Sequence, residues 1–230
     1  MKNEDHKSEI TFLESIVLLG LNDKGWFGNS ESRIRFGLAG ALLFELALRG
    51  EIEISGEQVV LIGENETGVI AYDDALKVLM KSGKKKNLNT TKAIQRIVYR
   101  SGLKWKNLLK ELIRKKIIRK EEYRLFWVFY QEKYPVVKTD IKKQLLSELY
   151  PKIMGEHDLT PHDIMLLAVM RSCKMIDKNF PAFDHFMKVR TKIREITEFK
   201  EPLPDSTRMI RDIQSGINKA IRISNVSLHI

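Results

Sequence analysis

Hydrophobic positions recur along most of the chain with the period of an α-helix. Thr11 and Glu14 have the spacing of a capping box, which predicts a short apolar helix ending near Gly20. A second helix is expected from Ser30 or Ser32 to Arg49, and it is apolar on almost every side, as buried helices are. The same spacing predicts further helices at 73–81, at 91–116 with a break at 101–102, at 140–150, from 161 onward and at 186–199.

Period-two alternation, typical of strands, is confined to short stretches. Residues 52–61 predict a hairpin, residues 62–72 a weaker one, and residues 117–118 with 125–130 a hairpin or wing closed before Pro135. The segment after Pro202 is only weakly patterned. We therefore predict a mainly α protein: a single helical-bundle domain with peripheral β-hairpins. Its expected parts are a polar tail (1–9), the domain (10–200) and a C-terminal segment packed on that domain (201–230).

Composition narrows the class of protein. The chain has 230 residues, 43% of them hydrophobic, which is ordinary for a globular domain. Its single cysteine, Cys173, excludes an intrachain disulfide and suits a reducing compartment. The longest nearly uncharged apolar stretch, residues 36–44, is far shorter than the ~20 residues that span a bilayer. The first nine residues are polar and resemble no signal peptide. A soluble, cytoplasmic, basic protein is expected.

Positive charge is concentrated in one segment. Residues 81–120 contain 15 Lys and Arg and one acidic residue, Glu111, so this segment supplies all of the net charge of +10. Folded onto one face, such a segment attracts polyanions. Nucleic acid and an anionic membrane surface are both candidates, and a solvated basic helix without a ligand is the plain alternative.

None of the sequence motifs typical of common enzyme classes is found in the chain. The chain has no phosphate-binding Gly-x-x-x-x-Gly-Lys loop, no Gly-x-Gly-x-x-Gly motif and no Gly-x-Ser-x-Gly motif. His157, Asp158, His162 and Asp163 are close in sequence but offer no further ligand, and the last two are expected in the first turn of a helix. We expect a protein that is not an enzyme and binds neither metal nor cofactor.

Three aromatic groups have more than one interpretation. Trp26 and Phe27 lie in a Gly-flanked polar loop, where they either form a tip for a membrane interface or fold back onto the core. Trp105 is in phase with Leu108 and Leu112, which favours a core or rim position, although it could also contact a bound headgroup. The third group spans residues 126–130, and half of it must be buried if it is a strand.

Several motifs resemble the Golgi phosphoprotein 3 family from about Ile10 to Phe199. They are Thr11-x-x-Glu14, Leu18-Leu-Gly-Leu21 with Asp23 and Gly25, Gly37-Leu-x-Gly40, Glu45-Leu-Ala-Leu-Arg-Gly50, the segment 68–76 ending Asp-Asp-Ala-Leu, Leu112-Ile-Arg-Lys-x-Ile-Ile118 and Leu166-Leu-Ala168. The resemblance implies a mainly α-helical peripheral membrane protein. It also implies binding of phosphatidylinositol 4-phosphate and retention of glycosyltransferases in the Golgi, as in eukaryotic members. A basic N-terminal extension of those members is absent, which indicates a bacterial or archaeal relative.

The resemblance also implies a headgroup pocket built from one loop Trp and three Arg. Here those Arg positions correspond to Ala39, Gly102 and Trp105, and the loop Trp to about Ser30. Neighbouring residues are expected to substitute for them. The predicted lipid-binding residues are Trp26, Arg33, Arg35, Arg100, Lys104, Trp105 and Lys106.

The family's hairpin for self-association and membrane contact would correspond to Phe126–Pro135, with Phe126, Trp127, Phe129 and Tyr130 as contact residues. The expected partners are an anionic membrane lipid on the cytoplasmic face, a second copy of the chain through the 126–135 hairpin, and an unidentified protein cargo. A different class stays open: a basic helix followed by an aromatic hairpin is also typical of a winged-helix nucleic-acid-binding protein.

Overall fold

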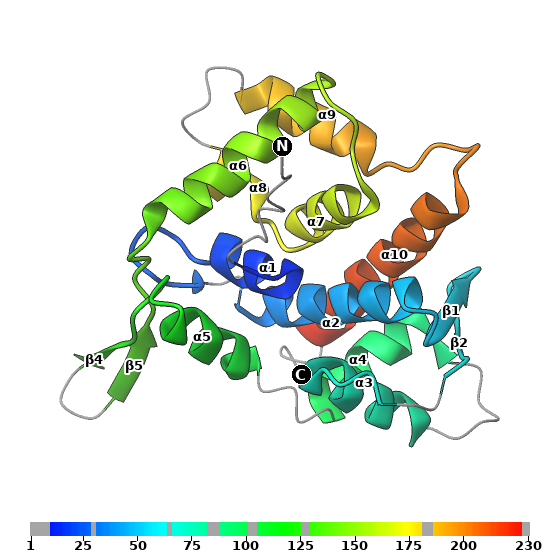
Figure 1. Cartoon of the computed structure of the whole chain (residues 1–230), viewed down its shortest axis with the longest axis horizontal. Coiled ribbons are helices and arrows are strands. Elements are labelled where there is room, and N and C mark those ends of the chain that lie inside the picture. The colour runs from blue at the N-terminus through cyan, green and yellow to red at the C-terminus, as the bar shows by residue number, and fades with distance from the viewer. Residues whose placement is uncertain are drawn as a thin grey trace, which may run out of the picture.

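A computed structural model describes residues 10–28, 31–63, 66–81, 88–100, 105–125, 129–180 and 186–226, without the side chains of 123–125, 129, 130 and 226. Helices make up most of this part of the chain (Figure 1). They are α1 (Phe12–Gly20), α2 (Glu31–Leu48), α3 (Ile70–Met80), α4 (Thr90–Arg100), α5 (Trp105–Arg114), α6 (Thr139–Met154), α7 (Pro161–Ser172), α8 (Ile176–Asn179), α9 (Phe186–Ile196) and α10 (Asp205–Val226). The prediction of a mainly α protein with peripheral hairpins is confirmed.

Helix α2 lies at the centre of the fold and packs against α1, α4, α7 and α10. Glycines permit the close approach of two of these neighbours. A Cβ added at Gly37 would lie 2.7 Å from Sγ of Cys173 at the end of α7, and one added at Gly40 would lie 2.4 Å from Cδ1 of Ile217 in α10. The Gly-Leu-x-Gly motif therefore sets the spacing of the core helices.

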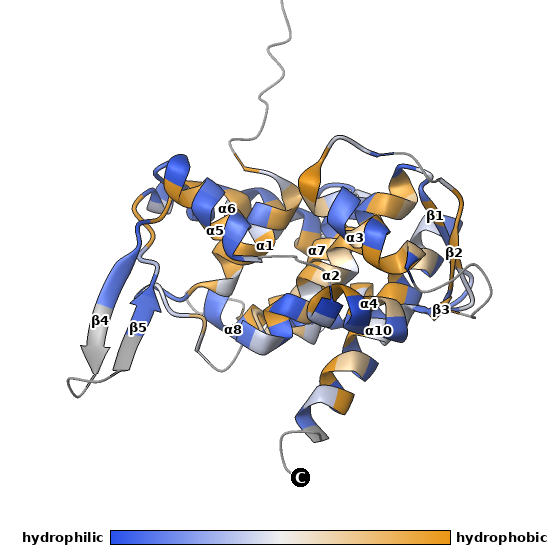
Figure 2. Ribbon diagram, turned by 90° about the horizontal axis from the view of Figure 1, so that it is seen from below, coloured by the Kyte–Doolittle hydropathy of each residue, from blue (hydrophilic) through white to orange (hydrophobic). Residues whose placement is uncertain are grey.

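Two small antiparallel sheets lie at opposite ends of the molecule (Figures 1 and 2). The first has the order β1-β2-β3 and consists of β1 (Ile52–Ser55), β2 (Gln58–Leu61) and β3 (Leu88–Asn89). The second consists of β4 (Glu121–Leu125) and β5 (Phe129–Lys133), paired so that Glu122 lies opposite Glu132. In Figure 2 this second hairpin projects away from the helical body.

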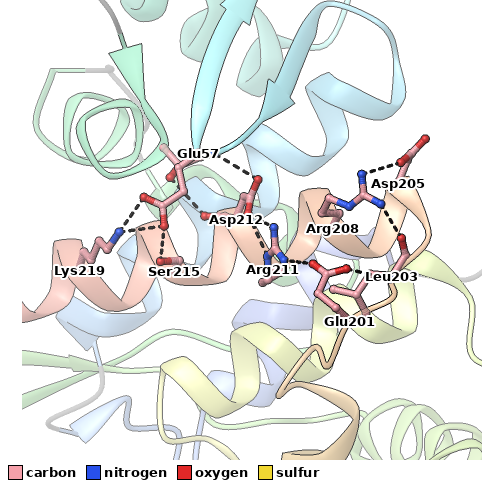
Figure 3. Close-up of polar contacts among 10 residues, drawn as sticks. Glu57, Glu201, Leu203, Asp205, Arg208, Arg211, Asp212, Ser215 and Lys219 are labelled. Carbon is pink, nitrogen blue, oxygen red and sulfur yellow. Dashed lines mark hydrogen bonds and ion pairs between the residues drawn. The ribbon is translucent and has the colours of Figure 1, made fainter.

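The first sheet is fixed to α10 through Glu57, which lies in the β1–β2 turn at a φ of 63° (Figure 3). The Glu57 N–H donates to Oδ2 of Asp212 at 3.1 Å, and its carboxylate accepts hydrogen bonds from Ser215 and Lys219. Thr90, at the start of α4, donates its hydroxyl to the Asp212 carbonyl at 3.2 Å. Residues far apart in sequence thereby meet on one face of α10.

The structure corrects two sequence-based expectations and adds one helix that the sequence pattern did not predict. Residues 70–80 form α3, so the weaker hairpin predicted at 62–72 is wrong. Residues 125–130 are not one strand, because β4 ends at Leu125 and β5 begins at Phe129. The weakly patterned segment after Pro202 contains α10, which packs against α2, α4 and α7. Among the residues that the structure describes, none of the helices has the length and apolar character needed to cross a membrane.

Candidate functional site

The loop that carries Trp26 is held in a fixed conformation by Asn22. The Asn22 side-chain oxygen accepts hydrogen bonds from the backbone N–H groups of Lys24, at 3.0 Å, and of Trp26, at 2.9 Å. Gly25 has a φ of 79°, and a Cβ there would lie 2.3 Å from the Pro135 nitrogen. The Gly25 carbonyl accepts from the Tyr134 N–H at 2.8 Å. Only glycine allows this contact, which seats the loop against the base of the second hairpin.

Trp26 and Trp105 line one open cleft of about 1190 Å³ between this loop, the start of α2, the start of α5 and the second hairpin. Trp26 is half-buried, whereas Phe27 folds back onto the core. The Trp105 ring is buried and packs edge-on against Phe27, with ring centroids 5.1 Å apart. The other described lining residues are Asn22, Gly28, Glu31, Lys106, Glu122, Gln131, Glu132 and Tyr134.

Glu132 interacts with three polar side chains at or beside the cleft. Its carboxylate lies 2.8 Å from Nζ of Lys120 and 3.2 Å from Nζ of Lys106, and it accepts the Tyr134 hydroxyl at 2.6 Å. Hydrogen bonds from Lys120, Tyr134 and Lys106 lower the pKa of Glu132 to about 2. Burial and the hydrogen bond to Glu132 raise the pKa of Tyr134. Both lysines are thus already paired with the same carboxylate.

The described walls of the cleft contain three carboxylates, from Glu31, Glu122 and Glu132, against one ammonium group, from Lys106. Lys120 reaches both Glu122, at 3.2 Å, and Glu132, which lie opposite each other on β4 and β5. An anionic ligand at this cleft therefore has to exchange partners with Glu132. The count of Lys and Arg between residues 81 and 120 did not indicate this, because the acidic residues come from other segments.

The remaining predicted lipid-binding residues lie elsewhere or outside the described residues. Arg33 and Arg35 are half-buried on α2, and Arg35 donates to the Val98 carbonyl at 3.3 Å, close to where α4 ends at the exposed Arg100. None of these three lines the cleft. Lys104, Phe126 and Trp127 lie outside the described residues, as do the side chains of Phe129 and Tyr130. So do Ser30 and Gly102, whereas Ala39 is fully buried in α2.

Sequence reasoning missed the residues that organise the cleft: Asn22, Lys120, Glu132 and Tyr134. A weak signal was present, since the polar residues Glu121-Glu122 and Gln131-Glu132-Lys133 flank the aromatic segment on both sides. Their role depends on the register of the two strands, which brings Glu122 and Glu132 face to face. Like charges directly opposite are unfavourable unless a cation bridges them, as Lys120 does.

The histidine and aspartate residues considered as metal ligands have other partners. Asp163 completes the capping box of α7 with Thr160 and lies 2.8 Å from Lys152, while His162 contacts Glu45 at 2.9 Å. Within the described part of the chain no three His, Cys, Asp or Glu side chains are grouped as metal ligands would be. Cys173 is buried, which raises its pKa to about 12.

Comparison with known proteins decides the family. The family model for Golgi phosphoprotein 3 (GPP34) matches residues 13–213. The chain belongs to the Golgi phosphoprotein 3 family. It is 26% identical over 175 residues to vacuolar protein sorting-associated protein 74 of Eremothecium gossypii, covering 66% of this chain and 53% of that protein. The protein of the same name from Schizosaccharomyces pombe is 27% identical over 186 residues, covering 68% of this chain and 53% of that protein. The chain thus spans about half the length of these relatives.

Proposed function

We propose that this chain is a peripheral membrane-binding module that recognises anionic lipid headgroups of the phosphatidylinositol 4-phosphate type on the cytoplasmic face of a membrane. The observation that carries the proposal is that Trp26 and Lys106, two residues expected at the headgroup site, line the same open cleft. Two further observations support it. The chain belongs to the Golgi phosphoprotein 3 family, and the names of the matched relatives associate those relatives with protein sorting.

The cleft offers two complementary types of contact. Trp26 is half-buried in a loop fixed by Asn22, so its indole presents a rigid amphipathic surface of the kind found at membrane interfaces. Lys106 is exposed on the first turn of α5 beside it, and a headgroup phosphate would replace Glu132, 3.2 Å away, as the partner of its ammonium group. Lys110 and Arg114 continue the exposed positive face along α5, and each Lys or Arg near an anionic surface contributes ~1 kcal/mol.

Vesicle sedimentation tests the proposal. The chain should bind phosphatidylcholine vesicles that contain phosphatidylinositol 4-phosphate or phosphatidylserine more strongly than phosphatidylcholine alone, and added salt should weaken that binding. Trp26→Ala and Lys106→Gln should each reduce binding about fivefold, which corresponds to ~1 kcal/mol. Lys143→Gln, an exposed lysine of α6, removes the same charge away from the cleft and is the matched control. Equal binding to neutral and anionic vesicles at low salt would rule the proposal out.

Nucleic acid is the alternative ligand, and one arrangement favours it: the basic helix α5 is followed directly by the β4–β5 hairpin, as in winged-helix proteins. A mobility shift with duplex DNA that persists at moderate salt, together with absent vesicle binding, would establish this alternative. The same preparation of protein serves both measurements.

Self-association through the 126–135 hairpin is a separate part of the proposal. The described strands of this hairpin, β4 and β5, project from the helical body in Figure 2, which leaves room for a second copy beside them. Analytical ultracentrifugation of the wild-type chain and of Trp127→Ser should show a dimer that the substitution dissociates. A wild-type monomer at all concentrations would contradict this part without affecting the lipid-binding part.

A further inference from the structure

A second cavity, of about 570 Å³, lies between the end of α7, the start of α8 and one face of α9. It shares no described lining residue with the Trp26 cleft. Four cationic side chains line it, against one carboxylate, that of Asp177. The four are Arg171, Lys174, Arg190 and Arg194. All four lie outside the 81–120 basic segment, as two pairs that are separate in sequence, so only the fold brings the group together.

Helix α9 directs one of its faces into this cavity. Met187, Arg190 and Arg194 have the spacing of one helical face and all line the cavity, whereas Val189 and Ile193 are buried in the core. Arg190 and Arg194 are four residues apart, so their like charges are neighbours on the helix surface and repel each other. An anion bound between them would remove this repulsion.

The carboxylates near the cavity balance these charges only weakly. Asp177 lies 4.0 Å from Nε of Arg190, and Glu198 lies 3.4 Å from Nε of Arg194, both longer than a charge-assisted hydrogen bond. Within the described residues, no ion pair involves Lys174, which is exposed. In the Trp26 cleft, by contrast, the Glu132 carboxylate lies at the shorter distance of 2.8 Å from Nζ of Lys120.

Arg171 is held in place at the wall of the cavity. Its Nη1 donates to the backbone carbonyl of Thr197 at 3.0 Å and to the Thr197 hydroxyl at 2.9 Å. These bonds fix the plane of the guanidinium group, which reduces the conformational entropy that ligand binding would otherwise remove. A fixed guanidinium suits the planar, bidentate recognition of a phosphate group.

We propose that this cavity is a second anion-binding site that takes a phosphate group, bound by Arg171, Arg190 and Arg194 and assisted by Lys174. Its volume exceeds that of one phosphate, and the exposed Met187 provides an apolar wall for the carbon part of the ligand. A soluble phosphate compound and a phospholipid headgroup share this chemistry. The site lies on α9 and α7, away from the β4–β5 hairpin (Figure 1), and does not depend on the function proposed above.

Calorimetric titration with pyrophosphate and with glycerol 3-phosphate, together with sedimentation on phosphatidylcholine vesicles with and without phosphatidic acid, tests the site. The variant Arg190→Gln/Arg194→Gln should weaken binding about tenfold or more, since it removes two charge-assisted contacts. The control Lys188→Gln/Lys192→Gln removes the same charge from the same helix but from residues that do not line the cavity. It should change binding less than about twofold.

The calorimetric and the vesicle measurements distinguish a soluble phosphate compound from a phospholipid headgroup as the ligand. Saturable binding of the soluble compounds that only the arginine variant weakens supports a soluble ligand, and the same dependence on phosphatidic acid vesicles supports a headgroup. Absence of binding in both arms, or equal losses in the two double variants, would overturn the proposal. All substituted positions are on the surface, and unchanged circular dichroism verifies that the variants fold. Trp26→Ala, which does not line this cavity, should leave the calorimetric binding of the soluble compounds unchanged, so failure here is distinct from failure at the first cleft.

Discussion

Lys106 of α5 and Glu132 of β5 form an ion pair of 3.2 Å across the candidate lipid-binding cleft. The same carboxylate binds Lys120 and the Tyr134 hydroxyl, so one acidic side chain fastens the hairpin to the helical body. Glu132 thereby occupies the cations that an anionic headgroup would use. The affinity of the cleft for an anionic ligand therefore depends on competition between that ligand and the Glu132 carboxylate.

Removing that competitor should strengthen membrane binding. Glu132→Gln keeps the size of the side chain but frees Lys106 and Lys120 from a full negative charge. We expect binding to phosphatidylserine vesicles to increase about fivefold, which is ~1 kcal/mol for one unit of charge near the membrane. Vesicle sedimentation over a range of lipid concentrations gives the measurement.

The matched control for this prediction is Glu121→Gln. Glu121 lies on the same hairpin and pairs with Arg119 and Lys133, but it does not line the cleft. It should raise binding less than Glu132→Gln does. An equal increase in both variants would mean that net charge alone, rather than the cleft, determines the affinity.

The low pKa of Glu132 also predicts how stability depends on pH. Hydrogen bonds from Lys120, Tyr134 and Lys106 lower this pKa from 4.5 to about 2 in the folded protein. A lowered carboxyl pKa stabilises the folded state above the unfolded value, and that stabilisation is lost as the pH falls from 4.5 towards 2. In urea unfolding, wild type should exceed Glu132→Gln in stability at pH 6, and the difference should shrink at pH 3. A difference independent of pH would contradict this assignment.

The helices with local signals were predictable from the sequence. Thr11 with Glu14 and Thr160 with Asp163 lie three residues apart, and both pairs form the capping boxes that their spacing predicts. Helix α10 was missed because its buried side carries Asp212 and Gln214, which obscure the apolar stripe of Ile210, Ile213 and Ile217. Asp212 can be buried on this side because it accepts a hydrogen bond from the backbone N–H of Glu57, which lies in the β1–β2 turn.

The candidate cleft was only partly predictable, because tertiary contacts bring some of its residues together. Trp26, Trp105 and Lys106 are recognisable from composition and from the family resemblance, and all three line it. Glu31, Glu122 and Glu132 come from α2, β4 and β5, and their approach to the lysines depends on tertiary contacts and strand register. The basic cavity beside α9 was missed because Arg171 and Lys174 join Arg190 and Arg194 only in the folded chain.

Asp212 should contribute to stability through Glu57. It is 4% exposed, and its Oδ2 accepts the Glu57 N–H at 3.1 Å (Figure 3). Asp212→Ala leaves that amide without its partner in a partly buried turn, at a cost of about 1–3 kcal/mol. Urea denaturation measures the loss. Asp205→Ala, at an exposed position paired with Arg208, should change the free energy of unfolding by less than about 0.5 kcal/mol. Equal effects would argue against the Glu57 contact as the cause.

The contact between α2 and α10 should tolerate no larger side chain at Gly40. Replacing glycine by alanine within a helix normally stabilises it by about 1 kcal/mol. Here the added Cβ would lie 2.4 Å from Cδ1 of Ile217, so Gly40→Ala should instead destabilise the protein by about 1–3 kcal/mol through overpacking.

A double variant separates this steric cause from any other effect of the substitution. Ile217→Ala removes Cδ1 and Cγ1, the two atoms closest to the added Cβ at 2.4 and 2.7 Å, and by itself should cost about 2–5 kcal/mol. In Gly40→Ala/Ile217→Ala the added methyl group occupies space that the Ile217 side chain has left, so the combined loss in the free energy of unfolding should be smaller than the sum of the single losses. Chemical denaturation of all four proteins measures this coupling, and strictly additive losses would show that the α2–α10 contact does not limit the size of residue 40.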